Sequence, residues 1–154
     1  MNSSKTTIAV DVMGGDNSPF KTLKGLENFI YRKKDANFIL LGDQKEIENT
    51  INHKNIDIKN YTIQNTTDNI DDKDTANTIL RKKKNSSIYQ GLQLVKASEA
   101  SGFVSAGNTG ALMILSRLIL GMIEGVDRPA ICSIIPNKID YSIMLDLGAN
   151  STVL

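Results

Sequence analysis

The chain alternates short, continuously apolar runs with longer segments in which apolar residues recur every three or four positions. Continuous runs are typical of strands buried in a parallel sheet, and the longer period is typical of amphipathic helices. The pattern predicts strands at residues 7–12, 37–42, 102–107, 130–135 and 142–147, with a weaker one at 57–63. It predicts helices at residues 19–33, after a cap at Asp43, from about 75 to 96 with a break at 85–87, and from 108 to about 124. This alternation indicates βαβ units and therefore an α/β fold with a parallel sheet.

Composition excludes several classes of protein. A length of 154 residues with 40% hydrophobic content is enough for one compact domain, so residues 1–154 are expected to belong to a single α/β domain. The formal net charge of +1 argues against nucleic-acid binding, which normally requires a basic excess. A single cysteine, Cys132, and a single histidine, His53, exclude an internal disulfide, a cysteine zinc site and a histidine-rich metal site. We therefore expect no metal and no cofactor.

The apolar segments are too short for a membrane or secretion signal. The most apolar window, residues 111–123, is interrupted by Arg117. A membrane-spanning helix needs about 20 apolar residues, and no long apolar stretch precedes the first predicted strand. A cytoplasmic location is therefore expected. In a doubly wound sheet a helix follows each strand, and the sequence stops soon after the last predicted strand, so we expect this chain to be the first part of a longer protein.

Small and polar residues follow the first predicted strand, as expected of a ligand site at the carboxyl end of a strand in an open α/β sheet. In Asp11-Val-Met-Gly-Gly-Asp16, the residues Gly14 and Gly15 let backbone N–H groups approach an anion, and the next helix adds the positive end of its dipole. The segment matches neither the dinucleotide fingerprint nor a P-loop. A tight turn in which Asp16 only caps the helix explains the pattern equally well.

The segment Ser105-Ala-Gly-Asn-Thr-Gly110 has the strongest character of a site. Ser105, Asn108 and Thr109 offer polar side chains at the predicted start of a helix, where backbone N–H groups without acceptors favour phosphate. The alternative is ordinary capping by Asn108, with Gly107 and Gly110 allowing close packing. A cap needs one polar residue and this segment supplies three, so we favour an anion site.

Two further segments are weaker candidates. Asp146-Leu-Gly-Ala-Asn150 follows another predicted strand, and Asp146 and Asn150 could face a ligand. The basic run Arg81-Lys-Lys-Lys84 comes after a polar loop at residues 65–74. Such a run is usually a solvated helix face, and its functional interpretation is the attraction of an acidic partner or an anionic substrate.

Other residues are interpreted as structural. His53 lies in a polar stretch and is expected in an exposed loop, which excludes a Ser-His-Asp or Cys-His catalytic arrangement. Cys132 lies in an apolar run and is expected to be a small core residue. The helix over residues 112–123 is apolar on nearly all faces, which favours burial in the core and leaves a subunit interface open.

Five separated segments, in order, carry a resemblance to a known family. They are Ile8-Ala-Val-Asp-Val-Met-Gly-Gly-Asp16 with Pro19, Arg81-Lys-Lys-Lys-Asn-Ser-Ser87, Ser105-Ala-Gly-Asn-Thr-Gly-Ala-Leu-Met113, Gly125-Val-Asp-Arg-Pro-Ala130 and Leu145-Asp-Leu-Gly-Ala-Asn150. Together they resemble the PlsX family, the acyl-ACP–phosphate acyltransferases of bacterial phospholipid synthesis. Family proteins are longer and usually continue with Val-Asp after Gly-Ala-Asn, whereas this chain has Ser151 and Thr152.

The resemblance implies a fold, an activity and partners. The implied fold is a Rossmann-like three-layer α/β/α sandwich with a mostly parallel sheet, like that of phosphotransacetylases. The implied reaction transfers a fatty acyl group from acyl carrier protein to orthophosphate. The implied partners are the carrier protein and a second copy in a homodimer, with peripheral membrane association of the full-length family. Alternatives are an inactive chain that folds or dimerises, and a phosphotransacetylase-like enzyme that uses acyl-CoA.

The residues and the resemblance together assign roles to this site. The implied reaction is a direct attack of phosphate on the thioester, in which Asn108 and Thr109 are expected to form the phosphate or oxyanion cradle. Lys82 either neutralises phosphate or contacts the carrier protein, and Arg81, Lys83 and Lys84 are candidates for carrier-protein docking. The remaining phosphate-binding candidates are Gly14, Gly15, Asp16, Ser105, Gly107, Gly110, Arg128, Asp146 and Asn150.

Overall fold

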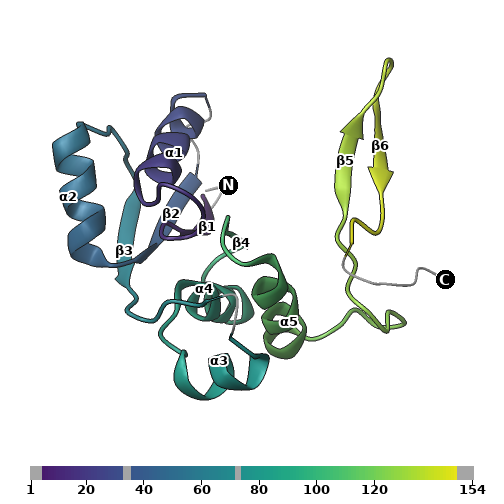
Figure 1. The fold of residues 1–154 in the computed structure, drawn as a ribbon. Coiled ribbons are helices and arrows are strands. Elements are labelled where there is room, and N and C mark those ends of the chain that lie inside the picture. The colour runs from purple at the N-terminus through teal and green to yellow at the C-terminus, as the bar shows by residue number, and fades with distance from the viewer. Residues whose placement is uncertain (1–4, 33–35, 72–73, 149–154) are drawn as a thin grey trace. The chain divides into compact units, whose positions relative to one another are not determined.

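The computed structural model describes residues 5–32, 36–71 and 74–148. The chain divides into two compact units, residues 1–120 and 121–154, and the single-domain expectation stays a prediction. The elements of the first unit are β1 (Thr6–Asp11), α1 (Phe20–Arg32), β2 (Ala36–Gly42), α2 (Gln44–Lys54), β3 (Tyr61–Asn65), α3 (Ala76–Lys82), α4 (Ser87–Lys96), β4 (Gly102–Val104) and α5 (Thr109–Leu120), shown in Figure 1. The second unit holds β5 (Ser133–Pro136) and β6 (Tyr141–Met144).

The first unit is built on a parallel sheet with the strand order β3-β2-β1-β4. The chain moves outward from β1 through β2 to β3, and then returns to place β4 on the other side of β1. The order therefore reverses between β1 and β4, which is the topological switch point where open α/β sheets bind ligands. The predicted parallel α/β sheet is confirmed.

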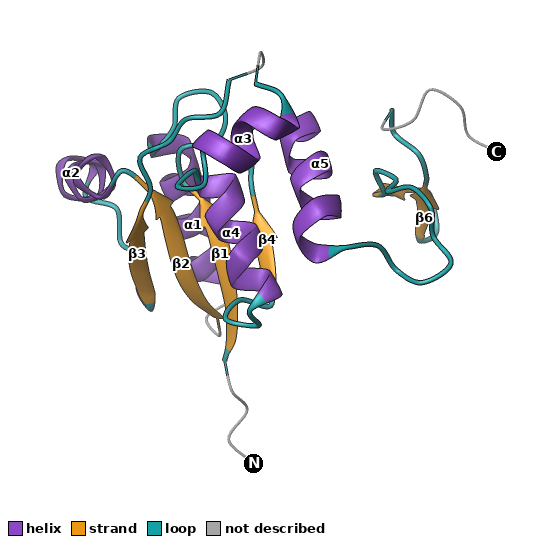
Figure 2. Cartoon of the chain, turned by 90° about the horizontal axis from the view of Figure 1, so that it is seen from below, coloured by secondary structure: helices purple, strands orange, loops and turns teal. Residues whose placement is uncertain are grey.

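Helices cover both faces of this sheet, which makes three layers (Figure 2). Successive side chains of a strand point to opposite faces, so Leu40 packs with Leu23 of α1 and Ile47 of α2, whereas Leu41 packs with Leu94 of α4. Both leucines are fully buried, which explains why the strand is continuously apolar. On the α4 side, α3 and α5 add a further cluster around Ile79 and Leu115.

Capping side chains mark where three of the helices begin. Asp43 caps α2 by accepting a hydrogen bond from the Glu46 N–H at 2.9 Å, which confirms the predicted cap. Thr75 and Ser86 cap α3 and α4 in the same way, through the N–H groups of Thr78 and Tyr89. The two helices are thus separate, as the predicted break at 85–87 indicates.

The prediction that the helix after Asn108 is buried on all sides is wrong. α5 ends at Leu120, before the predicted 124, because Gly121 adopts a φ of +87°. Ala111, Leu115 and Ile119 are buried against α3 and α4, but Ile114, Leu118 and Leu120 are exposed. Only one side of α5 meets other elements of its unit, and the interpretation of its apolar face as a subunit interface stays a prediction.

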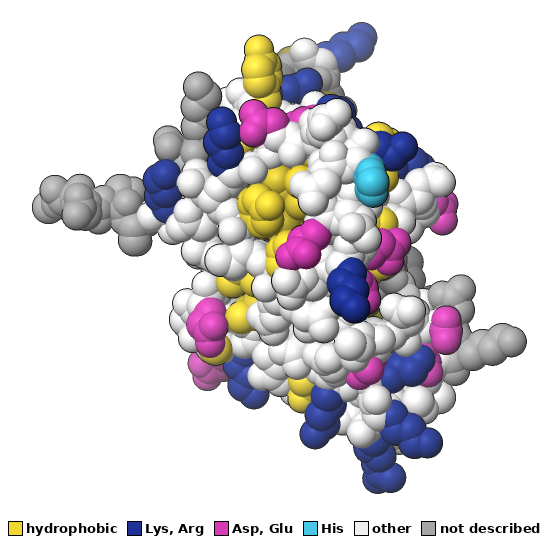
Figure 3. Space-filling view, turned by 90° about the vertical axis from the view of Figure 1, so that its left-hand side faces the viewer, with side chains coloured by type: hydrophobic (Ala, Val, Ile, Leu, Met, Phe, Trp, Pro, Cys, Tyr) yellow, Lys and Arg dark blue, Asp and Glu magenta, His cyan; other side chains and the backbone are white. Residues whose placement is uncertain are grey.

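Two single-residue predictions also need correction. Cys132 is exposed rather than a core residue, because its segment leads into a two-stranded hairpin, and the described part of its unit (residues 121–148) contains no helix. His53 is exposed as predicted, but it lies in the last turn of α2 and not in a loop. Figure 3 shows the single histidine at the surface, on a face where positive and negative side chains are interspersed.

The second unit is an antiparallel hairpin, where the sequence pattern suggested parallel strands. β5 and β6 pair from Ser133 with Met144 to Pro136 with Tyr141. The Asn137 side-chain oxygen accepts from the N–H groups of Ile139 and Asp140, which closes the turn. The connection is too short for the crossover that a parallel pair requires.

None of the helices in the described ranges has the length and apolar character needed to cross a membrane. Within the same ranges, no three His, Cys, Asp or Glu side chains are grouped so that they could hold a metal ion.

Candidate functional site

A pocket of about 570 Å³ lies at the carboxyl ends of β1 and β4. This volume is within the usual range of small-molecule sites. The pocket is lined by the segment after β1, the segment after β4, the loop between β3 and α3, and the start of α4. Its lining residues are Asp11, Met13, Gly14, Gly15, Asp16, Asp68, Asn69, Ile70, Asp71, Ser87, Ile88, Ala106, Gly107 and Asn108. The structure therefore brings together parts of two segments that the sequence predicted separately, residues 11–16 and 105–110. Thr109 and Gly110 of the second segment are not among the lining residues.

Hydrogen bonds join these two segments beneath the pocket. Ser105 Oγ donates to Asp11 Oδ2 at 2.7 Å and accepts from the Gly107 N–H at 3.0 Å. Asp11 Oδ1 accepts from the Met13 N–H at 3.2 Å, and Asp11 is only 2% exposed. Two predicted anion donors, the Ser105 hydroxyl and the Gly107 amide, are therefore hydrogen-bonded within the protein. Sequence analysis did not assign a role to Asp11, although it ends a buried strand at the switch point.

Asn108 both caps α5 and lines the pocket. Its Oδ1 accepts from the Ala111 N–H at 2.7 Å, and its carbonyl accepts from the Leu112 N–H at 3.0 Å. The two interpretations of this residue, cap and ligand contact, are thus compatible. Thr109 and Gly110 are exposed in the first turn, where N–H groups lack an intrahelical acceptor. The positive end of the α5 dipole and these N–H groups make this the part of the site best suited to an anion.

The loop after β3 forms a pocket wall that sequence analysis missed. Asp68, Asn69, Ile70 and Asp71 line the pocket, although this stretch was predicted only as a polar loop. Asp68 Oδ2 accepts from the Asn85 N–H at 2.9 Å, and the Asn85 carbonyl accepts from the Thr67 N–H at 3.1 Å. The sequence signal that could have identified this loop is its position directly after a predicted strand, since the carboxyl ends of parallel strands share one edge of the sheet.

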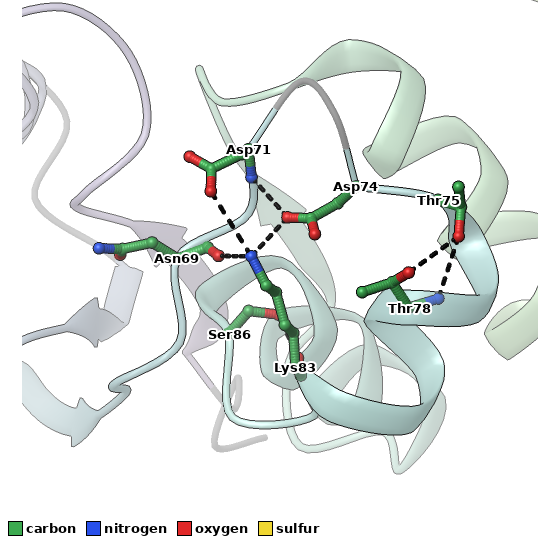
Figure 4. Close-up of polar contacts among 7 residues, drawn as sticks. All are labelled: Asn69, Asp71, Asp74, Thr75, Thr78, Lys83 and Ser86. Carbon is green, nitrogen blue, oxygen red and sulfur yellow. Dashed lines mark hydrogen bonds and ion pairs between the residues drawn. The ribbon is translucent and has the colours of Figure 1, made fainter.

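Lys83 holds this wall against the end of α3 (Figure 4). Its ammonium group donates to the Asn69 carbonyl at 2.6 Å and to Asp74 Oδ2 at 2.5 Å, and lies 3.7 Å from Asp71 Oδ2. The side chains of Lys83 and Asp74 are 22% and 12% exposed, whereas Arg81, Lys82 and Lys84 are exposed residues. Lys83 therefore differs from its basic neighbours, because its charge is engaged within the protein.

Replacing Lys83 by methionine is expected to destabilise the fold in a pH-dependent way. The hydrogen bond from Lys83 lowers the pKa of Asp74 below its ordinary 3.8, and Asp74 in turn raises the pKa of Lys83 above 10.5. The stabilisation from Asp74 is present above pH 3.8 and is lost as the pH falls through the lowered pKa. That from Lys83 is present below pH 10.5 and is lost as the pH rises through the raised pKa.

Urea unfolding midpoints, measured from pH 2 to 11, test this. The difference in urea midpoint between the parent chain and Lys83→Met should be largest between pH 3.8 and pH 10.5 and should shrink on acidification. The matched control, Lys84→Met, removes an exposed lysine and should leave the midpoint unchanged. A pH-independent effect of Lys83→Met would show that the ion pair does not stabilise the loop.

The pocket is rich in carboxylates. Asp11, Asp16, Asp68 and Asp71 line it, and no lysine or arginine is among the described lining residues. Lys82, predicted to act on phosphate, and its neighbours Arg81 and Lys84 lie at the end of α3 outside this lining. Lys and Arg side chains gather at the lower end of Figure 3, where α3 lies. An anion in the described pocket would therefore depend on backbone N–H groups and the α5 dipole for its attraction.

The remaining predicted residues belong to the second unit. Arg128 is exposed. Asp146 Oδ1 accepts from the Ile131 N–H at 2.9 Å, so this carboxylate connects the two ends of the hairpin unit. Asn150 lies outside the described residues.

The arrangement of these elements is that of the phosphotransacetylase-like α/β fold. The EutD phosphotransacetylase from Staphylococcus aureus matches this chain with a TM-score of 0.64 and 23% sequence identity. The match covers 92% of this chain and 46% of that one. It confirms the predicted fold class.

A family model described as fatty acid synthesis protein matches residues 6–153, and the chain belongs to this family, the PlsX family. A phosphate acyltransferase of Herminiimonas arsenicoxydans is 44% identical over 145 residues, which are 93% of this chain and 41% of the relative. One of Pelagibacter ubique is 39% identical over 143 residues, 93% of this chain and 42% of the relative. The predicted family is thus confirmed, and the chain spans about two fifths of the length of these curated relatives.

Proposed function

We propose that this chain contributes the phosphate-binding part of a phosphate acyltransferase that transfers a fatty acyl group from acyl carrier protein to orthophosphate. The observation that carries the proposal is the pocket at the β1–β4 switch point, which Gly14, Gly15 and Asn108, the residue that caps α5, line together. The relatives named phosphate acyltransferase support acyl transfer to phosphate as the reaction, because they align with 93% of this chain.

The reaction requires a pocket that positions two substrates. A phosphate oxygen attacks the thioester carbonyl carbon, the new C–O bond forms, and the C–S bond then breaks to release the carrier thiol. No covalent enzyme intermediate is needed. The protein's contribution is to hold phosphate beside the thioester and to stabilise the negative charge that develops on the carbonyl oxygen. Asn108, Thr109 and Gly110 at the start of α5 are the groups to which we assign this role.

The exposed basic residues at the end of α3 fit a docking role better than a catalytic one. Arg81, Lys82 and Lys84 are exposed and lie outside the described pocket lining, whereas Lys83 is bound to Asp74. Exposed cations steer an acidic partner at long range, and salt screens this attraction. We assign Arg81, Lys82 and Lys84 to carrier-protein docking and Lys83 to the pocket wall.

Acyl phosphate formation from long-chain acyl-ACP and orthophosphate, trapped as the hydroxamate, tests the proposal. Product that requires both substrates would support it, and long-chain acyl-CoA in place of acyl-ACP tests the choice of thioester. No product from the folded chain with either thioester would show that this chain does not carry the activity alone, and a lack of orthophosphate binding would contradict the proposed phosphate-binding part. The family membership rests on sequence and would stand.

Charge reversal at Lys82 and Lys84 is expected to raise the KM for acyl-ACP and to leave the KM for orthophosphate unchanged. The effect should weaken with added salt, because it acts through long-range attraction. Charge reversal at Lys45 and Lys96, two exposed lysines of α2 and α4, changes the net charge by the same amount and is the matched control. A change confined to the orthophosphate KM would contradict the docking assignment.

A further inference from the structure

Asp11 is the buried carboxylate at the junction of the two pocket-forming segments. It is 2% exposed, and no other Asp or Glu among the described residues is buried. Val10 of β1 pairs with Val104 of β4, so the residues that follow them, Asp11 and Ser105, lie side by side. These two residues are 94 positions apart in the sequence and are joined by the 2.7 Å hydrogen bond.

The carboxylate determines the direction of a short hydrogen-bond chain. A carboxylate only accepts hydrogen bonds, so the Ser105 hydroxyl must donate its hydrogen bond to Asp11. The lone pairs of that hydroxyl then receive the Gly107 N–H at 3.0 Å. The order is therefore Gly107 N–H to Ser105 Oγ–H to Asp11, and it holds the backbone immediately before Asn108.

The same carboxylate also contacts the opposite segment. Asp11 Oδ1 accepts from the Met13 N–H, and a Cβ atom on Gly14 would lie 2.6 Å from Asp11 Oδ2 and 2.7 Å from the Gly107 nitrogen. The turn after β1 and the loop after β4 are thus packed against one charged group, beneath the pocket that both of them line.

We propose that Asp11 is a positioning residue, which acts through Ser105 and Gly107 to set the orientation of Asn108 and the first turn of α5 toward an inorganic phosphate group. This inference rests on the proposed function for the identity of the ligand. Asp11 lines the pocket, and the role proposed for it is carried by the direction of its hydrogen bonds to Ser105 and Met13 rather than by packing volume.

Asp11→Asn tests this, because it keeps the size of the side chain and reverses one hydrogen bond. With its oxygen on the Met13 N–H, the new amide donates to Ser105 Oγ, and the hydroxyl proton must turn elsewhere. Ser105→Ala removes the hydroxyl that links the Gly107 N–H to Asp11, the middle of the hydrogen-bond relay Gly107–Ser105–Asp11. Asp43→Asn is the matched control, an aspartate directly after β2 whose capping role asparagine performs equally well.

The experiment is a titration of the isotope-labelled full chain with inorganic orthophosphate, followed by the backbone amide resonances. Asp11→Asn and Ser105→Ala are each expected to weaken orthophosphate binding by about tenfold or more, since each disturbs a hydrogen bond to a charged group. The double variant should be no weaker than the single ones, because both act through one relay. Asp43→Asn should bind like the parent chain.

Several results would overturn the inference. They are unchanged orthophosphate binding by folded Asp11→Asn, additive effects of the two substitutions, or an equal loss in Asp43→Asn. Should Asp11→Asn fail to fold, Ser105→Ala alone tests the inference by the same criteria.

If the parent chain binds no orthophosphate, the proposed function fails, and the amide resonances of Gly107 and Asn108 test the positioning role separately. Their movement in Asp11→Asn but not in Asp43→Asn would support it, and their constancy would refute it.

Discussion

Replacement of Asn108 by alanine is expected to lower the rate of acyl phosphate formation by about 10²–10³-fold, the usual cost of removing one donor from an oxyanion site. Asn108 lines the pocket at the N-terminus of α5, where the helix dipole already favours negative charge. The same substitution removes the cap that accepts the Ala111 N–H, which costs about 1 kcal/mol of stability. The rate is measured by hydroxamate trapping at saturating substrates, and stability by urea unfolding.

Two further substitutions separate catalysis from capping. Asn108→Asp keeps an oxygen that can cap α5 but has no hydrogen-bond donor, whereas Asn108→Ser keeps both a capping oxygen and a hydroxyl donor on a shorter side chain. Both should retain most of the stability, and Asn108→Asp should lose most of the activity, whereas Asn108→Ser should lose less. An aspartate variant with full activity would show that Asn108 acts only as a cap.

Gly14→Ala is expected to destabilise the protein by about 1–3 kcal/mol, as overpacking of a close-packed site usually does. The added methyl group would lie 2.6 Å from Asp11 Oδ2 and 2.7 Å from the Gly107 backbone nitrogen. One of these atoms belongs to a buried, hydrogen-bonded carboxylate and the other to the backbone, so neither can move at low cost. Because both neighbours lie beneath the pocket, the orthophosphate affinity should fall together with the free energy of unfolding.

Gly25→Ala is the matched control for this substitution. Gly25 is exposed within α1, and a Cβ atom there would have no neighbour within 4 Å. Alanine should stabilise this helix by about 0.5–1 kcal/mol. The two variants are compared by their urea midpoints and slopes. If Gly14→Ala were as stable as Gly25→Ala, the close packing of the Gly14 turn against β4 would be refuted.

The corrected predictions share one physical cause. The apolar pattern of α5 predicts burial on all sides, yet Leu118 is 54% exposed. The pattern within one segment does not show how many other elements that segment contacts. The apolar neighbours of Cys132 predict a core position, although the described residues of its unit form a hairpin that no helix covers. Hydrophobic periodicity reports which side chains would favour burial, and tertiary contacts decide which of them are buried.

The basic run illustrates the same limit for charge. Four adjacent residues, Arg81 to Lys84, are equivalent in the sequence, but only Lys83 reaches back to Asn69 and Asp74. The helix ends at Lys82, and the change in backbone direction at Lys83 turns its side chain toward the loop. Which lysine is structural and which are available to a partner depends on this end of the helix, which pattern analysis locates only to within a few residues.

The sequence by itself determined the parallel α/β fold, the family and the two segments that form the pocket, because these depend on local periodicity, turn residues and motif order. It did not determine that β4 lies beside β1, since strand order arises from long-range packing. That adjacency brings Asp11 to Ser105 and Gly14 to Gly107. It also adds the loop held by Lys83 as a third wall. Only the tertiary structure therefore decided that the predicted anion donors of Ser105 and Gly107 are hydrogen-bonded within the protein, and that Asp11 joins the two segments of the candidate site.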